Sequence, residues 1–74
     1  MARYYFDLDG QVPAHDVFGQ EYPDDGAAKA HGVSIAHHVA IDKPELAGDG
    51  NRIIVRDEKR TELFRLPIAI SERP

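Results

Sequence analysis

The sequence contains no cysteine and no long apolar run. Without cysteine there can be no disulfide, thiolate zinc site or thiol nucleophile, which excludes zinc fingers and thiol enzymes. No apolar stretch approaches the roughly 20 residues of a membrane span, and residues 1–6 lack the apolar core of a signal peptide. We therefore expect a soluble, cytoplasmic protein that does not bind a membrane.

Positive charge is also scarce, because nine Lys and Arg residues face thirteen Asp and Glu residues, for a formal net charge of −4. A negative chain opposes the phosphate backbone, so we expect no nucleic-acid binding. Acidic residues crowd the first third of the chain, whereas basic residues gather nearer its C-terminal end, at Arg52, Arg56, Lys59, Arg60 and Arg65. This asymmetry could steer self-association.

At 74 residues the chain is short for a domain, and we expect residues 1–74 to form a single one. A domain of this size buries only roughly 60% of the surface of its unfolded chain, so its stability is small. Association with a second copy would increase that stability. Length alone therefore makes a homodimer a serious hypothesis.

Two-residue alternation over residues 3–9 predicts a half-buried first strand. Its core side would carry Tyr4, Phe6 and Leu8. A loop longer than two residues should follow, because Pro13 cannot donate to a strand ladder. A tight turn over residues 16–19 then leads into a short second strand that ends before Pro23.

A helix is expected over residues 26–40, with Asp24 or Asp25 as its N-cap. Its apolar stripe is narrow and consists mostly of small residues, which allows a close approach to a sheet. The stripe contains Ala28, Gly32, Ile35, Ala36 and Val39. Pro44 and the glycines after it should end the helix and form a long loop.

Residues 51–57 are β-branched and residues 61–66 alternate, so both are predicted strands, joined by a four-residue hairpin turn. Pro67 should mark a strand end or an edge. Two hairpins around one helix can bury their apolar faces only as one sheet with the helix across it. We therefore predict an α+β fold, in the order β-β-α-β-β, with one helix packed on one face of a four-stranded antiparallel sheet.

The predicted sheet has two different faces. Most of the core should come from Tyr4, Phe6, Leu8, Ile53, Val55, Phe64 and Leu66. The other face would carry Tyr5, Ile54 and Leu63. That apolar area suggests that another chain covers the second face.

The order of these signals is informative: an opening Arg3-Tyr4-Tyr5-Phe6-Asp7-Leu8 strand, Asp16-x-x-Gly19, Tyr22-Pro23-Asp24 before an alanine-rich helix, Val55-Arg56-Asp57 and Leu66-Pro67. It resembles a family of short bacterial proteins of rhizobial type that is known as a domain of unknown function. The glycine expected in the second hairpin near Lys59 is missing, as are the leucines usual in the helix. The resemblance implies this fold over nearly the whole chain, and no activity, cofactor or catalytic residue.

The histidines are the most tempting candidates for a site, since imidazole is a common metal ligand and general base. His37 and His38 are adjacent and point about 100° apart on a helix, and His31 lies two turns from His38, so no i, i+4 metal pair is present. His15 next to Asp16 could be a base with its orienting acid, but no nucleophile is placed beside them. An exposed imidazole at a turn is the simpler interpretation.

Five carboxylates could form a calcium or magnesium site if loops brought them together: Asp7, Asp9, Asp16, Asp24 and Asp25. Turn and cap roles explain most of them, and we assign no catalytic, cofactor-binding or metal-binding residue. The leading hypothesis is a small non-enzymatic protein-interaction or regulatory domain that acts as a homodimer, with a second, unknown protein as a further partner. The alternative is a small-molecule or metal-ion binding domain that uses His15, His31 and the acidic residues.

Overall fold

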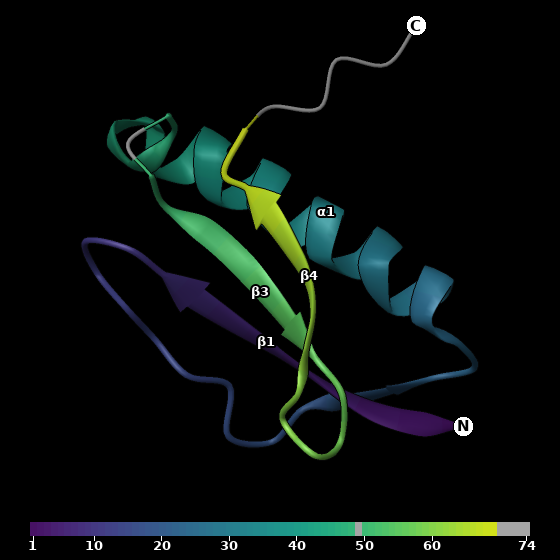
Figure 1. The fold of residues 1–74 in the computed structure, drawn as a ribbon. Coiled ribbons are helices and arrows are strands. Elements are labelled where there is room, and N and C mark those ends of the chain that lie inside the picture. The colour runs from purple at the N-terminus through teal and green to yellow at the C-terminus, as the bar shows by residue number, and fades with distance from the viewer. Residues whose placement is uncertain (49, 70–74) are drawn as a thin grey trace, which may run out of the picture.

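The computed structural model describes residues 1–48 and 50–69. These residues form a four-stranded antiparallel sheet with one long helix across one of its faces (Figure 1). In chain order the elements are β1 (Ala2–Asp9), β2 (Gln20–Tyr22), α1 (Asp25–Asp42), the 3-10 helix η1 (Pro44–Leu46), β3 (Arg52–Arg56) and β4 (Glu62–Pro67). The predicted α+β fold and strand–strand–helix–strand–strand order are confirmed. None of the helices in this part of the chain has the length and apolar character needed to cross a bilayer.

The strand order in the sheet is β2-β1-β3-β4, which the sequence had left open. β1 pairs with β2 through residues 2–4 and with β3 through residues 5–9. β3 then pairs with β4 across the second hairpin. β2 and β4 are therefore the two edge strands. β2 pairs only with the first residues of β1, so the loop between β1 and β2 follows the rest of that side of β1.

Pro67 lies at the end of β4 and on an edge strand, as predicted. Pro67 is opposite Arg52 in the register, and the neighbouring Ile68 N–H donates to the carbonyl of Asn51. In an antiparallel ladder, hydrogen-bonded pairs alternate with non-bonded pairs. Ile68 and Asn51 are hydrogen-bonded, so the N–H of a residue at position 67 would point away from β3. Proline is tolerated there because no ladder hydrogen bond is lost.

The core lies between α1 and the sheet face that carries Tyr4, Ile53, Val55 and Leu66, all of which are buried. α1 contributes its predicted stripe of small residues, now extended by Ala40, and ends two residues later than expected. A Cβ at Gly32 would lie 2.7 Å from Leu66 Cδ1 and 2.9 Å from Val55 Cγ2. The absence of a side chain there allows the helix to approach the sheet closely.

The prediction of an uncovered apolar second face, meaning the sheet face away from α1, is wrong. Ile54 belongs to this face but is already buried within the chain, at 2% exposure. Leu63 packs against the core on the helix side, because a β-bulge near Val55 and Arg56 makes it the extra residue of β4. Tyr5 is partly buried, and the guanidinium of Arg60 lies over its ring. Other positions of the face are occupied by ion pairs: Asp7 with Arg56, Asp9 with Arg52 and Glu62 with Arg65.

Candidate functional site

The candidate site is built on the loop of residues 10–19, which returns along the free edge of β1. At its start, Gln11 N–H donates to Asn51 Oδ1 at 2.7 Å, and Leu8 and Ala14 exchange two backbone hydrogen bonds. Gln20 then pairs with Tyr4. The residues between these two pairings, 15–19, outnumber the three residues of β1 that they face, so the backbone must arch away from the ladder.

Asp16 takes over the hydrogen bonds that the arched backbone cannot make. Its Oδ2 accepts from Phe6 N–H at 3.2 Å, and its Oδ1 accepts from Phe18 N–H at 3.2 Å and Gly19 N–H at 3.0 Å. Gly19 has φ of 70°, and a Cβ there would lie 2.7 Å from the carbonyl of Tyr4. The predicted Asp16-x-x-Gly19 turn is confirmed, and the three donors occupy its carboxylate.

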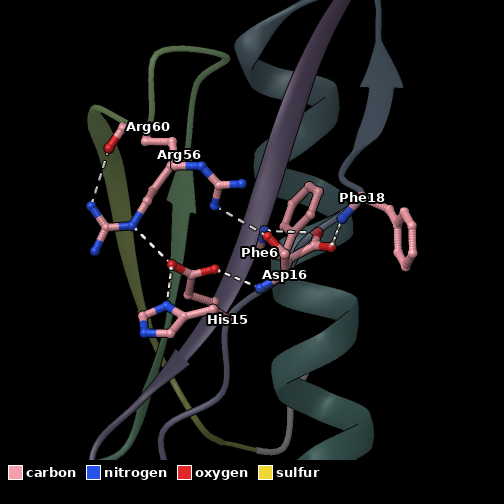
Figure 2. Close-up of polar contacts among 7 residues, drawn as sticks. Phe6, His15, Asp16, Phe18, Arg56 and Arg60 are labelled. Atoms are coloured by element: carbon pink, nitrogen blue, oxygen red, sulfur yellow. Dashed lines mark hydrogen bonds and ion pairs between the residues drawn. The ribbon is translucent and has the colours of Figure 1, made fainter.

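Asp7 lies at the centre of a polar network on the second face, which we define as Asp7, His15, Asp16, Arg56 and Arg60 (Figure 2). Asp7 is 4% exposed and accepts from Asp16 N–H at 2.9 Å and from Arg56 Nε–H at 3.0 Å. Burial raises the pKa of Asp7, but the hydrogen bonds from Asp16, His15 and Arg56 outweigh it and hold the pKa below its usual value. Asp7 is therefore an ionised carboxylate buried among its partners.

His15 is oriented by Asp7 and not by Asp16, the neighbour that the sequence suggested. Its Nδ1 lies 3.3 Å from Asp7 Oδ2, while 77% of its side chain is exposed, as the turn interpretation predicted. A histidine held by a buried carboxylate is half of a general-base arrangement. Within the described part of the chain, no hydroxyl forms a hydrogen bond with His15. Asp7 is eight positions away on β1, and only the return of the loop along β1 brings His15 to it, which is why the pairing escaped prediction.

Arg56 and Arg60 tie the loop to the hairpin between β3 and β4. Arg56 Nη1 donates to the carbonyl of Arg60 at 3.3 Å, and Arg60 Nη1 donates to the carbonyl of Asp16 at 3.2 Å. The guanidinium carbon of Arg60 lies 4.0 Å from the centre of the Tyr5 ring. Arg60 has φ of 64°, the left-handed conformation that favours glycine. The glycine missing from this hairpin is thus replaced by an arginine with side-chain contacts of its own.

The network also holds an apolar tip, Val17 and Phe18, away from the sheet. Phe18 is 83% exposed, and its ring points away from the other labelled residues in Figure 2. Its backbone is nevertheless fixed, because Phe18 N–H donates to Asp16 and its carbonyl accepts from Arg3 Nη1 at 2.7 Å. Sequence reasoning missed this tip because it assigned residues 16–22 only to a turn and a strand. An exposed aromatic inside a turn motif was the available signal.

The other histidines are used separately. His31 packs against the rings of Phe6 and Tyr22, with centroid distances of 5.0 and 5.4 Å. His38 Nδ1 lies 2.7 Å from the carbonyl of Ser34. Over residues 1–48 and 50–69, no three His, Cys, Asp or Glu side chains come close enough together to hold a metal ion.

Most of the remaining carboxylates have local roles. Asp24 Oδ1 accepts from Ala27 N–H at 2.8 Å and is the N-cap of α1, in agreement with the first of the two predicted caps. Asp25 Oδ1 accepts from the Tyr4 hydroxyl at 2.7 Å, and this hydrogen bond is the main reason that the pKa of Tyr4 is raised to about 12. Asp9 pairs with Arg52. The structure does not bring the five candidate carboxylates into one site.

Comparison with known proteins identifies a family. The family described as Domain of unknown function (DUF6894) matches residues 3–69. A search of curated proteins and a search of solved structures each found no match. The family match covers most of the chain, so the chain belongs to this family.

Proposed function

We propose that this member of the DUF6894 family is a small non-enzymatic protein-interaction domain that acts as a homodimer. The observation that carries the proposal is a difference between the two edges of the sheet. The β4 edge ends in Pro67, and proline on an edge strand is a usual means of preventing strand pairing. The opposite edge has exposed apolar side chains instead.

We call this opposite surface the apolar edge and define it as Met1, Val12, Val17 and Phe18. They are four of the six large apolar side chains that are exposed among the described residues. Met1 directly precedes β1, and the other three lie on the loop that returns along the free side of β1 and leads into β2. Rigid, exposed aromatic residues are typical anchors of protein interfaces.

A second copy is the partner that this surface fits best. The outer side of β2 is an open strand edge, and it directly follows the Val17–Phe18 tip in the chain. Arg3 and Glu21, side chains 43% and 55% exposed, place both signs of charge on the same edge. A two-fold interface must be self-complementary, and one edge with apolar groups and both charges meets that requirement. A domain this short would also gain stability from the added burial.

The proposal includes a cytoplasmic location in a bacterium and no nucleic-acid binding, as expected from the sequence.

The alternative function is small-molecule or metal-ion binding. One observation favours it: the side chains of His15, Arg56 and Arg60 have nitrogen atoms without a hydrogen-bond partner among the described residues.

The proposal is tested by sedimentation equilibrium on the wild type, Phe18→Asp and the matched control Ile41→Asp. Ile41 is 54% exposed on α1, away from the apolar edge. We expect twice the 8.3 kDa chain mass for the wild type and the control, and the single-chain mass for Phe18→Asp. A wild type that stays monomeric at millimolar concentration would reject the homodimer. A dimer that survives Phe18→Asp would reject the apolar edge as its interface.

A further inference from the structure

In the polar network on the second face, the carboxylates are largely used and several nitrogen donors are not. Asp7 and Asp16 each receive hydrogen bonds from three groups, and Asp7 is almost fully buried. The charge of Asp7 is paired with Arg56 within the chain, and Asp16 accepts from three backbone N–H groups. Arg60 and His15 are exposed residues of the network.

Arg60 has the largest unused capacity. A guanidinium has five N–H donors, and that of Arg60 makes one hydrogen bond, to the carbonyl of Asp16. No carboxylate in the described ranges forms an ion pair with it. The other basic groups of the network are engaged elsewhere: Arg56 donates to Asp7 and to the Arg60 carbonyl, and its guanidinium points away from that of Arg60 in Figure 2. The unused donors of Arg60 are therefore the ones available to a ligand.

The backbone at Arg60 suggests that its side chain is needed. A left-handed residue in a hairpin turn would normally be glycine, and a residue with a Cβ costs about 1 kcal/mol or more there. Arg60 occupies the position nonetheless, and its guanidinium is fixed against the Tyr5 ring and the Asp16 carbonyl. A donor group held in place in this way loses little conformational entropy when it binds an anion.

We propose that Arg60 binds a small ligand through a carboxylate or phosphate group on the second face beside Tyr5. Guanidinium groups recognise both oxyanions by paired, charge-assisted hydrogen bonds. The site lies on the second face and not on the apolar edge. It does not depend on the homodimer, and either proposal can fail without the other.

The test is a nitrogen–proton NMR titration of the full chain, including the arginine Nε–H signals, in which inorganic phosphate or acetate replaces chloride at constant ionic strength. We expect saturable shifts in the millimolar range at Arg60 Nε–H and at the amides of residues 15–19. Saturation by phosphate alone assigns a phosphate-bearing ligand, and saturation by both anions assigns a general oxyanion site.

The key variant is Arg60→Gly, which removes the guanidinium and fits the left-handed backbone. It should abolish saturation, whereas Lys59→Gly, which removes a neighbouring cation in the same turn, should keep it. Arg60→Lys retains the charge without the paired donors and should weaken binding at least several-fold, which keeps the test usable if the glycine variant does not fold. Shifts that rise linearly with both anions, or saturation that survives in Arg60→Gly, would overturn the proposal.

Discussion

Asp7 is the single residue on which the second face depends most. Replacement by asparagine keeps the shape but leaves Arg56 and His15 without their buried anion. We expect Asp7→Asn to lower the free energy of unfolding by roughly 3 kcal/mol, as measured by urea denaturation. The control is Asp9→Asn, which breaks the more exposed pair with Arg52 and should change stability by less than about 1 kcal/mol. Equally small losses for both variants would contradict this role of Asp7.

Asp7 also predicts how stability depends on pH. The pKa of its carboxyl is lower in the folded chain than the ordinary 3.8, so folding favours the ionised form. Its contribution is therefore complete above that ordinary value and is lost as the pH falls through the lower, folded value. Between about pH 4 and pH 2, the stability difference between wild type and Asp7→Asn should shrink. Urea midpoints across this range measure it, and parallel profiles would argue against the prediction.

Arg60 allows backbone strain to be separated from side-chain contacts. Alanine and glycine both remove the contacts with Tyr5 and Asp16, but only glycine relieves the left-handed conformation. We expect Arg60→Gly to be more stable than Arg60→Ala by about 1 kcal/mol. Thermal unfolding of the two variants measures the difference. Equal melting temperatures would show that the turn relaxes when the arginine is removed.

At the scale of elements, the contact between α1 and the sheet is set by Gly32. Alanine there would gain about 1 kcal/mol of helix propensity, but its Cβ would collide with Leu66 and the stiff, fully buried Val55. We expect Gly32→Ala to be destabilising by roughly 1–3 kcal/mol in urea unfolding. Gly26→Ala is the matched control, because its Cβ would meet only Asp24 Oδ1, at 3.4 Å. A stabilising Gly32→Ala would mean that α1 lies further from the sheet.

The elements that could be predicted from the sequence are those with local signals. The strand β1, the cap at Asp24 and the edge at Pro67 each follow from residue types within a few positions. Phe64 lies on its predicted face but is only partly buried, with Lys29 over its ring. The buried turn at Leu46 gave no periodic pattern and was missed.

The polar network could not be predicted because its contacts join residues that are distant in sequence. Asp7 and Arg56 are 49 positions apart, and Arg60 and Asp16 are 44 apart. The pattern of residues 3–9 places Asp7 on the second face but does not show whether it is buried or exposed. Its burial becomes clear only when the loop and β3 are placed around it. The same long-range contacts explain the wrong expectation for the second face. The sequence showed its apolar residues but not the ion pairs that cover the face in the structure.

For the whole molecule, the account rests on the difference between a protected β4 edge and an apolar edge that is open. Because folding and association would be coupled in a dimer, the melting temperature of the wild type should rise with protein concentration. That of Phe18→Asp should stay constant. A wild-type melting temperature independent of concentration would speak against association. This measurement reports the presence of a dimer but not the surfaces that form it.

The most direct test of the central claim is an isotope-filtered NOE experiment on a mixture of labelled and unlabelled copies of the chain, which detects only contacts between copies. The account predicts intermolecular NOEs from the Phe18 ring to residues of β2 and to the apolar edge of the second copy. NOEs that connect α1 of one copy to the other copy, with none from Phe18, would contradict it, as would a spectrum without intermolecular NOEs at millimolar concentration.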